Sequence, residues 1–352
     1  MEPKRLVRIL VLTVIIAALL YFLPKGPVQV DSGNRILMGT VARVIAVAIH
    51  RDIAQRGIDK AFAELSRIEE LASTHLEDSE ISKINRLAFS QPVKVSDTTF
   101  EILQTAVDYG RLTSGAFDIS VGPLVELWQR AAEANQTPPN EELQNAFGKI
   151  GFDKIRLDPE NKTVRLGVEG MKLDLGGIAK GYAVDQAVAA LKDAGAVGGM
   201  VDVGGNIRCF GTPADGKKHW LIGLQDPNLS GKDQVLFVLE LGDAAVATSG
   251  DYRRFVVVQN RRHSHIIDPR TGQSATGLSS ASVITEKAVD ADALATAVNV
   301  LGAEEGLKLI ESLDNTEAIV VSPAPDYRIT ITAGAENYIT KSRVKPQIYA
   351  GR

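Results

Sequence analysis

The sequence predicts an α+β protein in which mixed, mostly antiparallel sheets are flanked by helices, with an N-terminal membrane-anchor helix in front of them. Stretches with apolar residues at helical spacing are interspersed with short β-prone stretches, so both element types are expected. The strand-like stretches of the second half follow one another in runs. That order favours mixed sheets over a doubly wound parallel sheet, in which single strands alternate with single helices.

The N-terminal segment has the features of a membrane anchor. Lys4, Arg5 and Arg8 precede an uncharged apolar run over residues 9–23. Because basic residues stay in the cytoplasm, we expect the rest of the chain on the periplasmic side of the inner membrane. Residues 1–24 are therefore interpreted as an uncleaved, single-pass signal anchor. A cleaved signal peptide is the main alternative, although the run offers no small-x-small cleavage site, and a buried soluble helix is the other.

Composition narrows the classes of function. The chain has 352 residues, of which 45% are hydrophobic and 23% charged, enough for a sizeable core in one or two domains. Its net charge is −4, so no overall basic field would recruit nucleic acid, and no nucleic-acid partner is expected. Cys209 is the only cysteine, which excludes an intrachain disulfide and a cysteine-based metal cluster. We expect it to be a small buried hydrophobic residue.

Further elements follow from periodicity and turn residues. A linker rich in Gly, Pro and Ser is expected over residues 25–34. One helix is predicted from Ile58 to Leu71 and another around residues 100–107, which Thr98 and Glu101 would open as a capping box. The polar stretch 133–142 is expected to be a surface loop. Strands are predicted over residues 164–168, 199–203, 220–225, 235–241, 255–258, 281–284 and 318–321.

The segment KLDLGGIAKGY, residues 172–182, has the pattern of a phosphate-binding turn. An apolar, β-prone approach turns through Gly176 and Gly177 into a stretch with helical spacing. Without Cβ atoms at the turn, an anion can approach the backbone N–H groups and meet the positive end of the helix dipole. A phosphate compound is therefore the first ligand to consider. The alternative is a tight turn that serves packing alone.

Two glycine-containing segments suggest further ligand contacts. In SGAFDISVGPLVELW, residues 114–128, an aromatic ring and a carboxylate within Ala116, Phe117 and Asp118 can line a pocket for a flat ring, or Phe117 can be simple core. In MVDVGGNIRCFG, residues 200–211, a second β-like run ends in a double glycine, which a bulged strand end also explains. Neither double glycine has the spacing of a Rossmann fingerprint or of a Walker A loop.

Two later segments carry candidate catalytic and metal-binding groups. His265 lies just before the turn residues of DPRTG, which can project its imidazole into a cleft, although a lone histidine is more often structural or exposed. Asp292 and Thr296 lie four residues apart and share one face of a predicted helix. A carboxylate with a hydroxyl forms a hard oxygen site that suits Mg²⁺, and Asp290 is available as a supporting or alternative acid. The alternative is an acid that only complements the helix dipole.

Together these segments resemble the ApbE-type FAD:protein FMN transferase family. The resemblance runs from Met38 to the helix of Asp292 and covers most of the exported chain. It identifies residues 35–352 as a flavin transferase catalytic domain. The strings that match, in the order of the family, are MGT, STHLEDSEISKIN, SGAFDISVGPLVELW, LDLGGIAKGYAVD, VDVGGNIRCFG, ATSGDYRRF, SHIIDPRTG and DADALAT.

The resemblance implies a set of site residues. Mg²⁺ would be held by the backbone carbonyl of Gly177 together with Asp292 and Thr296. The family position of His75 more often carries a bulky aromatic residue that stacks on the flavin, and the imidazole of His75 can still stack there. The residues implied to contact FAD are Met38, His75, Ala116, Phe117, Asp118, Asp174, Lys180 and Ile267.

The implied reaction is Mg²⁺-dependent transfer of the FMN moiety of FAD to a threonine hydroxyl of an acceptor protein, with release of AMP. The metal ion would act as a Lewis acid at the diphosphate. Because a hydroxyl is a poor nucleophile, a base would help to remove its proton, and His265 is the candidate. The expected acceptor is a subunit of a membrane-bound redox complex. An FAD pyrophosphatase that yields FMN and AMP, and a non-catalytic flavin-binding protein, are the alternatives.

Overall fold

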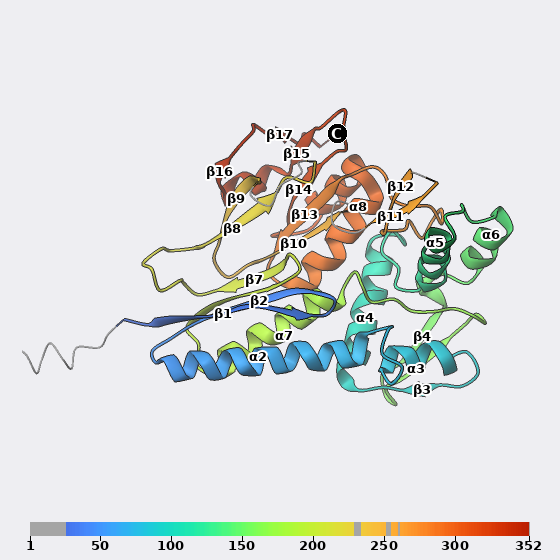
Figure 1. Cartoon of the computed structure of the whole chain (residues 1–352), viewed down its shortest axis with the longest axis horizontal. Coiled ribbons are helices and arrows are strands. Elements are labelled where there is room, and N and C mark those ends of the chain that lie inside the picture. The colour runs from blue at the N-terminus through green and yellow to red at the C-terminus, as the bar shows by residue number, and fades with distance from the viewer. Residues whose placement is uncertain (1–25, 229–233, 251–254, 260, 352) are drawn as a thin grey trace, which may run out of the picture.

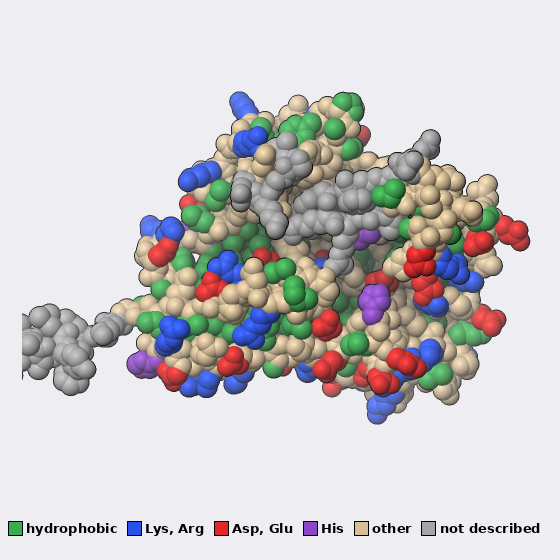
Figure 2. Space-filling model, in the orientation of Figure 1, with side chains coloured by type: hydrophobic (Ala, Val, Ile, Leu, Met, Phe, Trp, Pro, Cys, Tyr) green, Lys and Arg blue, Asp and Glu red, His purple; other side chains and the backbone are tan. Residues whose placement is uncertain are grey.

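The computed structural model describes residues 26–228, 234–250, 255–259 and 261–351. The predicted anchor, residues 1–24, lies outside these ranges. Within them, no helix is both long and apolar enough to cross a membrane. Charged side chains of both signs are interspersed over the face seen in Figure 2.

A nine-stranded sheet forms the centre of the molecule (Figure 1). Neighbouring strands pair antiparallel, except for the last pair, β15 and β17, which is parallel. The prediction of a mixed, mostly antiparallel sheet is therefore confirmed. In spatial order the strands are β1 (Val28–Leu37), β2 (Thr40–Ala48), β6 (Gly198–Val203), β7 (Asn206–Phe210), β10 (Ala245–Gly250), β13 (Ser280–Thr285), β14 (Glu317–Val321), β15 (Ile329–Ile331) and β17 (Gln347–Ile348).

Both faces of this sheet are covered, as the run VIAVA of β2 illustrates. Val44 and Ala46 face a core with the helices α2 (Arg51–Ala72), α4 (Asp97–Leu112) and α7 (Ala179–Asp193). Ile45 and Val47 face a second core, shared with a small sheet of β8 (Trp220–Gln225), β9 (Val235–Leu241) and β16 (Ile339–Ser342). Burial on both faces explains why this strand is continuously apolar. Figure 1 shows α2 and α7 on one side of the sheet and β8 and β9 on the other.

The long helix α8 (Ala288–Glu311) packs against β10, β13 and β14 and forms a further core with them. Gly302 interrupts it with a non-helical φ of 79°. The predicted helices over residues 58–71 and 100–107 are confirmed as parts of α2 and α4. Cys209 is buried as expected.

The remaining elements lie around the edges of these layers. All seven predicted strands are present within one or two residues of the predicted bounds, and the predicted loop over 133–142 is shortened to residues 135–139. The elements at the edges are α3 (Glu80–Leu87), β3 (Val93–Lys94), α5 (Gly122–Ala134), α6 (Asn140–Gly148), the 3-10 turn η1 (Phe152–Lys154), β4 (Ile155–Asp158), β5 (Thr163–Leu166), β11 (Phe255–Val258), β12 (Arg261–Ser264) and the 3-10 turn η2 (Ala333–Tyr338).

The predicted linker over residues 25–34 is wrong from Val28 onward, because β1 begins there and forms a hairpin with β2. Gly33, with a φ of 65°, lies at an irregularity of the ladder between Asp31 and Asn34. Val30 is the one residue of this strand that is fully buried. The strand is therefore held mainly by backbone pairing to β2, which its glycine- and serine-containing composition does not reveal.

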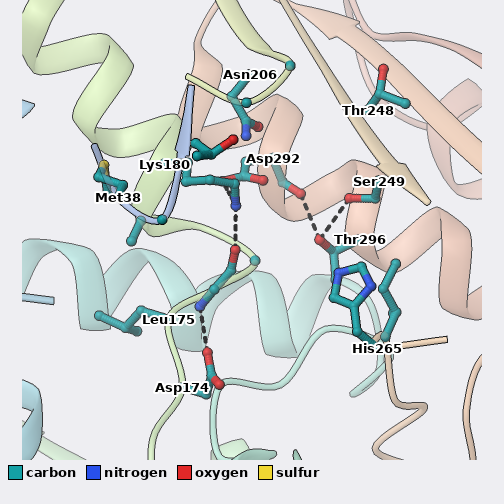
Figure 3. Close-up of a pocket in the computed structure, with 18 of the residues that line it drawn as sticks. Met38, Asp174, Leu175, Lys180, Asn206, Thr248, Ser249, His265, Asp292 and Thr296 are labelled. Carbon is teal, nitrogen blue, oxygen red and sulfur yellow. Dashed lines mark hydrogen bonds and ion pairs between the residues drawn. The ribbon is translucent and has the colours of Figure 1, made fainter. Parts of the chain in front are cut away.

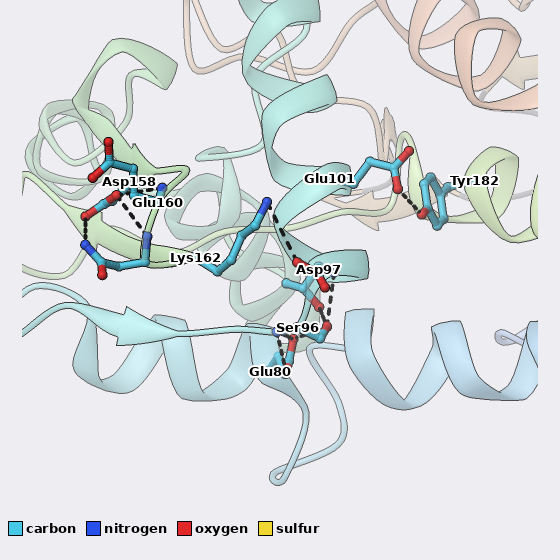
Figure 4. Close-up of polar contacts among 10 residues, drawn as sticks. Glu80, Ser96, Asp97, Glu101, Asp158, Glu160, Lys162 and Tyr182 are labelled. Atoms are coloured by element: carbon cyan, nitrogen blue, oxygen red, sulfur yellow. Dashed lines mark hydrogen bonds and ion pairs between the residues drawn. The ribbon is translucent and has the colours of Figure 1, made fainter.

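The predicted capping box at Thr98 and Glu101 is also wrong, since α4 begins at Asp97 and its N-cap is Ser96, two residues before Thr98 (Figure 4). The Ser96 hydroxyl accepts a hydrogen bond from the N–H of Thr99 at 3.2 Å. Glu80, on the neighbouring helix α3, accepts from the Ser96 N–H at 3.0 Å. Glu101 instead accepts a hydrogen bond from Tyr182 on α7 at 2.8 Å. An acid brought in by the tertiary fold thus replaces the local partner of a capping box.

Candidate active site

Residues 172–175, directly before the double glycine, form no β-strand. This corrects the expectation of a β-prone stretch leading into the turn. Lys172 makes a single parallel bridge with Val121. The Asn85 amide pairs with both backbone groups of Leu173, donating at 3.0 Å and accepting at 2.7 Å. Side-chain pairing therefore takes the place of a neighbouring strand and directs the chain into the turn.

The turn leads directly into α7, which begins at Ala179 without a capping side chain on its N-cap residue. The N–H of Gly176 donates to Asp174 Oδ1 at 2.7 Å, so one glycine N–H expected to face a ligand is used within the turn. The N–H of Gly181, in the first helical turn, donates to Asp292 Oδ2 at 2.9 Å. A carboxylate from α8 thus lies at the positive end of the α7 dipole.

Close backbone approach brings α7 and α8 together at this point. A Cβ atom on Gly181 would lie 2.2 Å from the carbonyl oxygen of Ala288 and 2.8 Å from Asp292 Cβ. A Cβ atom on Gly177 would lie 3.1 Å from Thr296 Oγ1 and 3.1 Å from the ring of Phe117. Glycine is required at the crossing, and it lets the backbone of the turn lie directly against the face of α8 that carries Asp292 and Thr296.

Asp292 is a buried carboxylate, 3% exposed, whose pKa is raised by burial. Lys180 and the Gly181 N–H oppose this shift because both favour the ionised form. Lys180 Nζ lies 3.6 Å from Asp292 Oδ2 and donates to the carbonyl oxygen of Gly176 at 2.6 Å (Figure 3). The turn, the lysine and the carboxylate therefore form one connected cluster.

Thr296 extends this cluster toward β10. Its hydroxyl donates to the Asp292 carbonyl oxygen at 3.0 Å and lies 3.2 Å from the hydroxyl of Ser249 (Figure 3). Sequence reasoning missed Ser249, although ATSGDYRRF was among the matching strings. The oxygen donors gathered here are one carboxylate, two hydroxyls and the backbone of Gly177, a hard set that fits Mg²⁺. No cluster of three or more His, Cys, Asp or Glu side chains able to hold a metal occurs in the described ranges.

A cavity of about 720 Å³ opens beside the cluster, and every site residue expected from the sequence lines it. These residues are Met38, His75, Ala116, Phe117, Asp118, Asp174, Gly177, Lys180, His265, Ile267, Asp292 and Thr296. They come from segments spread over most of the described chain. The volume lies in the range of small-molecule and cofactor sites. Leu175 and Asn206, which were not predicted, also line it.

The predicted FAD-contacting residues reach the cavity in different ways. Met38, with a φ of 51°, and Gly39, with a φ of 64°, form the two-residue turn between β1 and β2. His75 and His265 are exposed at the cavity. Ile267 is buried and forms an antiparallel bridge with Ser274.

Asp118 uses its carboxylate inside the protein. It accepts hydrogen bonds from the N–H and hydroxyl of Ser120, at 2.8 and 2.7 Å, and from the N–H of Phe152 at 2.8 Å. Burial raises the pKa of Asp118 in spite of these bonds, which favour the ionised form. The carboxylate holds the loop that presents Ala116 and Phe117, both of which are buried.

A second cavity of about 440 Å³ continues the first. It includes residues of α3 on one side and α5 on the other, and it reaches the extended residues 172–174. The two cavities share Thr74, His75, Val125, Gln129 and Asp174. The larger cavity therefore opens into a polar groove next to the glycine turn.

Comparison with known proteins identifies the fold family. The model of the ApbE family matches residues 38–320. The chain belongs to the ApbE family. It is 32% identical over 325 residues to an FAD:protein FMN transferase from Treponema pallidum, covering 88% of this chain and 89% of the relative. It is 33% identical over 280 residues to an FAD:protein FMN transferase from Vibrio cholerae, covering 79% of this chain and 83% of the relative.

Solved structures of ApbE proteins have the same architecture. The crystal structure of the ApbE protein from Thermotoga maritima superposes with a TM-score of 0.80 at 33% identity, over 90% of this chain and 100% of that one. The flavin transferase ApbE from Vibrio cholerae superposes with a TM-score of 0.77 at 30% identity, over 89% of this chain and 99% of that one. The resemblance inferred from the sequence is confirmed.

Proposed function

We propose that this chain transfers the FMN moiety of FAD to a threonine hydroxyl of an acceptor protein and releases AMP. The observation that carries the proposal is that the glycine turn, Lys180, Asp292, Thr296 and His265 all line the same cavity. The relatives named FAD:protein FMN transferase, which match most of the chain, support the same reaction.

In this reaction the acceptor hydroxyl oxygen forms a bond to the phosphorus of the FMN phosphate. The bond between that phosphorus and the bridging oxygen breaks, and AMP leaves with the bridging oxygen. The proton of the hydroxyl passes to a base, for which His265 is our candidate because it lines the cavity and is exposed there.

The other residues bind and orient the substrate. Met38, His75, the segment 116–118, Asp174 and Ile267 would contact FAD. Lys180 would counter the charge of the diphosphate, which the backbone of the glycine turn can approach closely.

Mg²⁺ would be held by Asp292, Thr296 and the carbonyl oxygen of Gly177, and when bound it supplies Lewis-acid charge neutralisation at the diphosphate. The close approach of Gly177 to Thr296 and the set of hard oxygen donors support this assignment.

The acceptor would approach through the groove between α3 and α5, because it meets the larger cavity at Asp174, two residues before Gly176. A polar groove suits a polypeptide segment that carries a hydroxyl to the phosphate. The apolar N-terminal segment supports single-pass anchoring in the inner membrane, with the catalytic domain on the periplasmic side and a membrane-bound redox subunit as acceptor.

The decisive test incubates the purified chain with FAD, Mg²⁺ and a candidate acceptor, and then measures the acceptor by intact-mass spectrometry. A mass gain equal to FMN less one water, with AMP in solution, supports transfer. Release of AMP and free FMN with an unchanged acceptor would favour FAD hydrolysis. Bound FAD without any product would favour a flavin-binding protein.

A further inference from the structure

Two buried side-chain atoms in the described ranges lack a hydrogen-bond partner, Asn206 Oδ1 and Asn299 Oδ1. Asn206 is 3% exposed and lines the large cavity, whereas Asn299 is 1% exposed and does not line it. Native proteins leave few buried polar groups unsatisfied. An unpaired acceptor in the wall of a substrate cavity therefore points to a partner supplied by the ligand.

The orientation of the Asn206 amide follows from its neighbours. Asn206 is the first residue of β7 and pairs with Val203 across the turn of Gly204 and Gly205. Its Nδ2 donates to the carbonyl oxygen of Val203 at 3.3 Å. Because only the amide nitrogen can donate to a carbonyl, Oδ1 is the atom left for another partner. Figure 3 shows this amide extending from its strand toward the cavity.

The turn that carries Asn206 is held independently of its side chain. The N–H of Gly204 donates to the carbonyl oxygen of Val41 at 2.9 Å. The N–H of Gly205 donates to Asp202 Oδ1 at 2.9 Å. The position of Asn206 is therefore set by the sheet and the turn, so its amide is prepared for binding before a ligand arrives.

We propose that Asn206 is a substrate-binding residue whose Oδ1 accepts a hydrogen bond from a neutral N–H or O–H group of FAD. This inference rests on the proposed function. The diphosphate oxygens carry no proton near neutral pH, so they cannot donate to an amide oxygen. Asn206 therefore recognises an uncharged part of FAD, a sugar or ribityl hydroxyl or a ring N–H, while Lys180 faces the diphosphate.

The test compares Asn206→Leu with Asn299→Leu as a matched control. Both asparagines donate Nδ2 to a backbone carbonyl, Asn206 to Val203 and Asn299 to Ser249 at 3.4 Å, and both leave Oδ1 unpaired. The FAD dissociation constant is measured by calorimetry at saturating Mg²⁺, and the melting temperature without ligand by scanning calorimetry. We expect Asn206→Leu to weaken FAD binding about tenfold to a hundredfold, and to lower the melting temperature no more than Asn299→Leu does, because both variants lose one bond to a backbone carbonyl. Asn299→Leu should leave the FAD dissociation constant unchanged, because Asn299 does not line the cavity.

Asn206→Ala is a second variant that should show the same loss of affinity. Titrations with FMN and with AMP, the two halves of FAD, identify which half carries the donor, because only that half should bind more weakly to the Asn206 variants than to the parent. Parent-like FAD affinity in both Asn206 variants would overturn the inference, whether or not Mg²⁺ binding or stability changes. Failure of the parent chain to bind FAD would instead overturn the proposed function.

Discussion

At the scale of single residues, Asp292 combines two roles that sequence reasoning treated as alternatives. It accepts a hydrogen bond from the first turn of α7, which is a helix-dipole contact, and it lines the cavity beside Thr296. The contact is made with a different helix from its own, since Asp292 belongs to α8. A buried acid with a raised pKa and a nearby lysine is typical of a functional site.

We predict that Asp292→Asn separates stability from activity. Because the fold raises the pKa of Asp292, ionisation costs more in the folded than in the unfolded state. This penalty is absent below the unfolded pKa of about 3.9, grows as the pH rises toward the folded pKa, and is complete above it. Urea denaturation should therefore show a higher free energy of unfolding for the ligand-free variant than for the parent at pH 8, and equal values near pH 3.

The same variant should lose at least about a hundredfold in Mg²⁺-dependent transfer, because a metal ligand is removed. Parent-like turnover at saturating FAD and Mg²⁺ would contradict the proposed metal site. If the variant were less stable than the parent at pH 8, the contacts of Lys180 and Gly181 would outweigh burial in their effect on the pKa of Asp292, which would contradict this prediction.

We predict that His265→Gln lowers the rate of FMN transfer about 10²- to 10⁴-fold, the usual contribution of a positioned base, while FAD binding stays within twofold. Glutamine keeps the size and polarity of the side chain but cannot take up a proton near neutral pH. Single-turnover acceptor labelling gives the rate and calorimetry gives the affinity. A variant as fast as the parent would remove His265 as the base.

At the scale of elements, α7 and α8 hold each other through reciprocal contacts at their N-terminal turns. Asp185 of α7 accepts from the N–H groups of Ala288 and Val289, at 3.0 and 2.9 Å, where α8 begins. Asp292 of α8 accepts from the N–H of Gly181, where α7 begins. Each helix thus supplies the carboxylate that satisfies donors of the other. The crossing is what aligns the glycine turn with the proposed metal ligands.

We predict that Gly181→Ala destabilises the protein by about 1–3 kcal/mol, the usual cost of overpacking, because its Cβ would lie 2.2 Å from the Ala288 carbonyl oxygen. Separation of the two helices should also weaken Mg²⁺ and FAD binding. Urea denaturation and calorimetry measure both effects. Gly148→Ala, at a helical glycine with no atom within 4 Å of the added methyl group, is the control and should not destabilise. Equal stability of the two variants would contradict close packing at the crossing.

Local reasoning about elements failed where a distant partner replaces a local one. Ser96 caps its own helix, α4, and its N–H donates to Glu80 from another helix, so the expected pair of Thr98 and Glu101 was misplaced. The glycine-containing start of β1 is held by pairing with β2. By contrast, the amphipathic stretches of α2 and α4 and the β-prone runs of the second half were located correctly, because their burial follows from their own periodicity.

At the scale of the whole molecule, the catalytic domain is organised around the central sheet, and β1 is its first strand. We predict that a chain starting at residue 26 folds and transfers FMN to a soluble acceptor like the full chain, but leaves the membrane fraction. A chain starting at residue 38 should be less stable, because it also lacks β1 and its ladder with β2. Cell fractionation and thermal melting test this. If the full-length chain were found in the soluble fraction, the prediction that residues 1–24 anchor it in the membrane would be contradicted.

The sequence by itself determined the α+β class, the family and the chemical types of the site residues, because periodicity and the order of motifs are properties of the chain alone. Only the tertiary structure decided that these residues line one cavity, that Asp292 is buried against α7, and that Ser249 and Asn206 join the site. Such facts depend on contacts between residues far apart in the chain. Burial, pKa and an unpaired acceptor exist only once those distant segments have packed together.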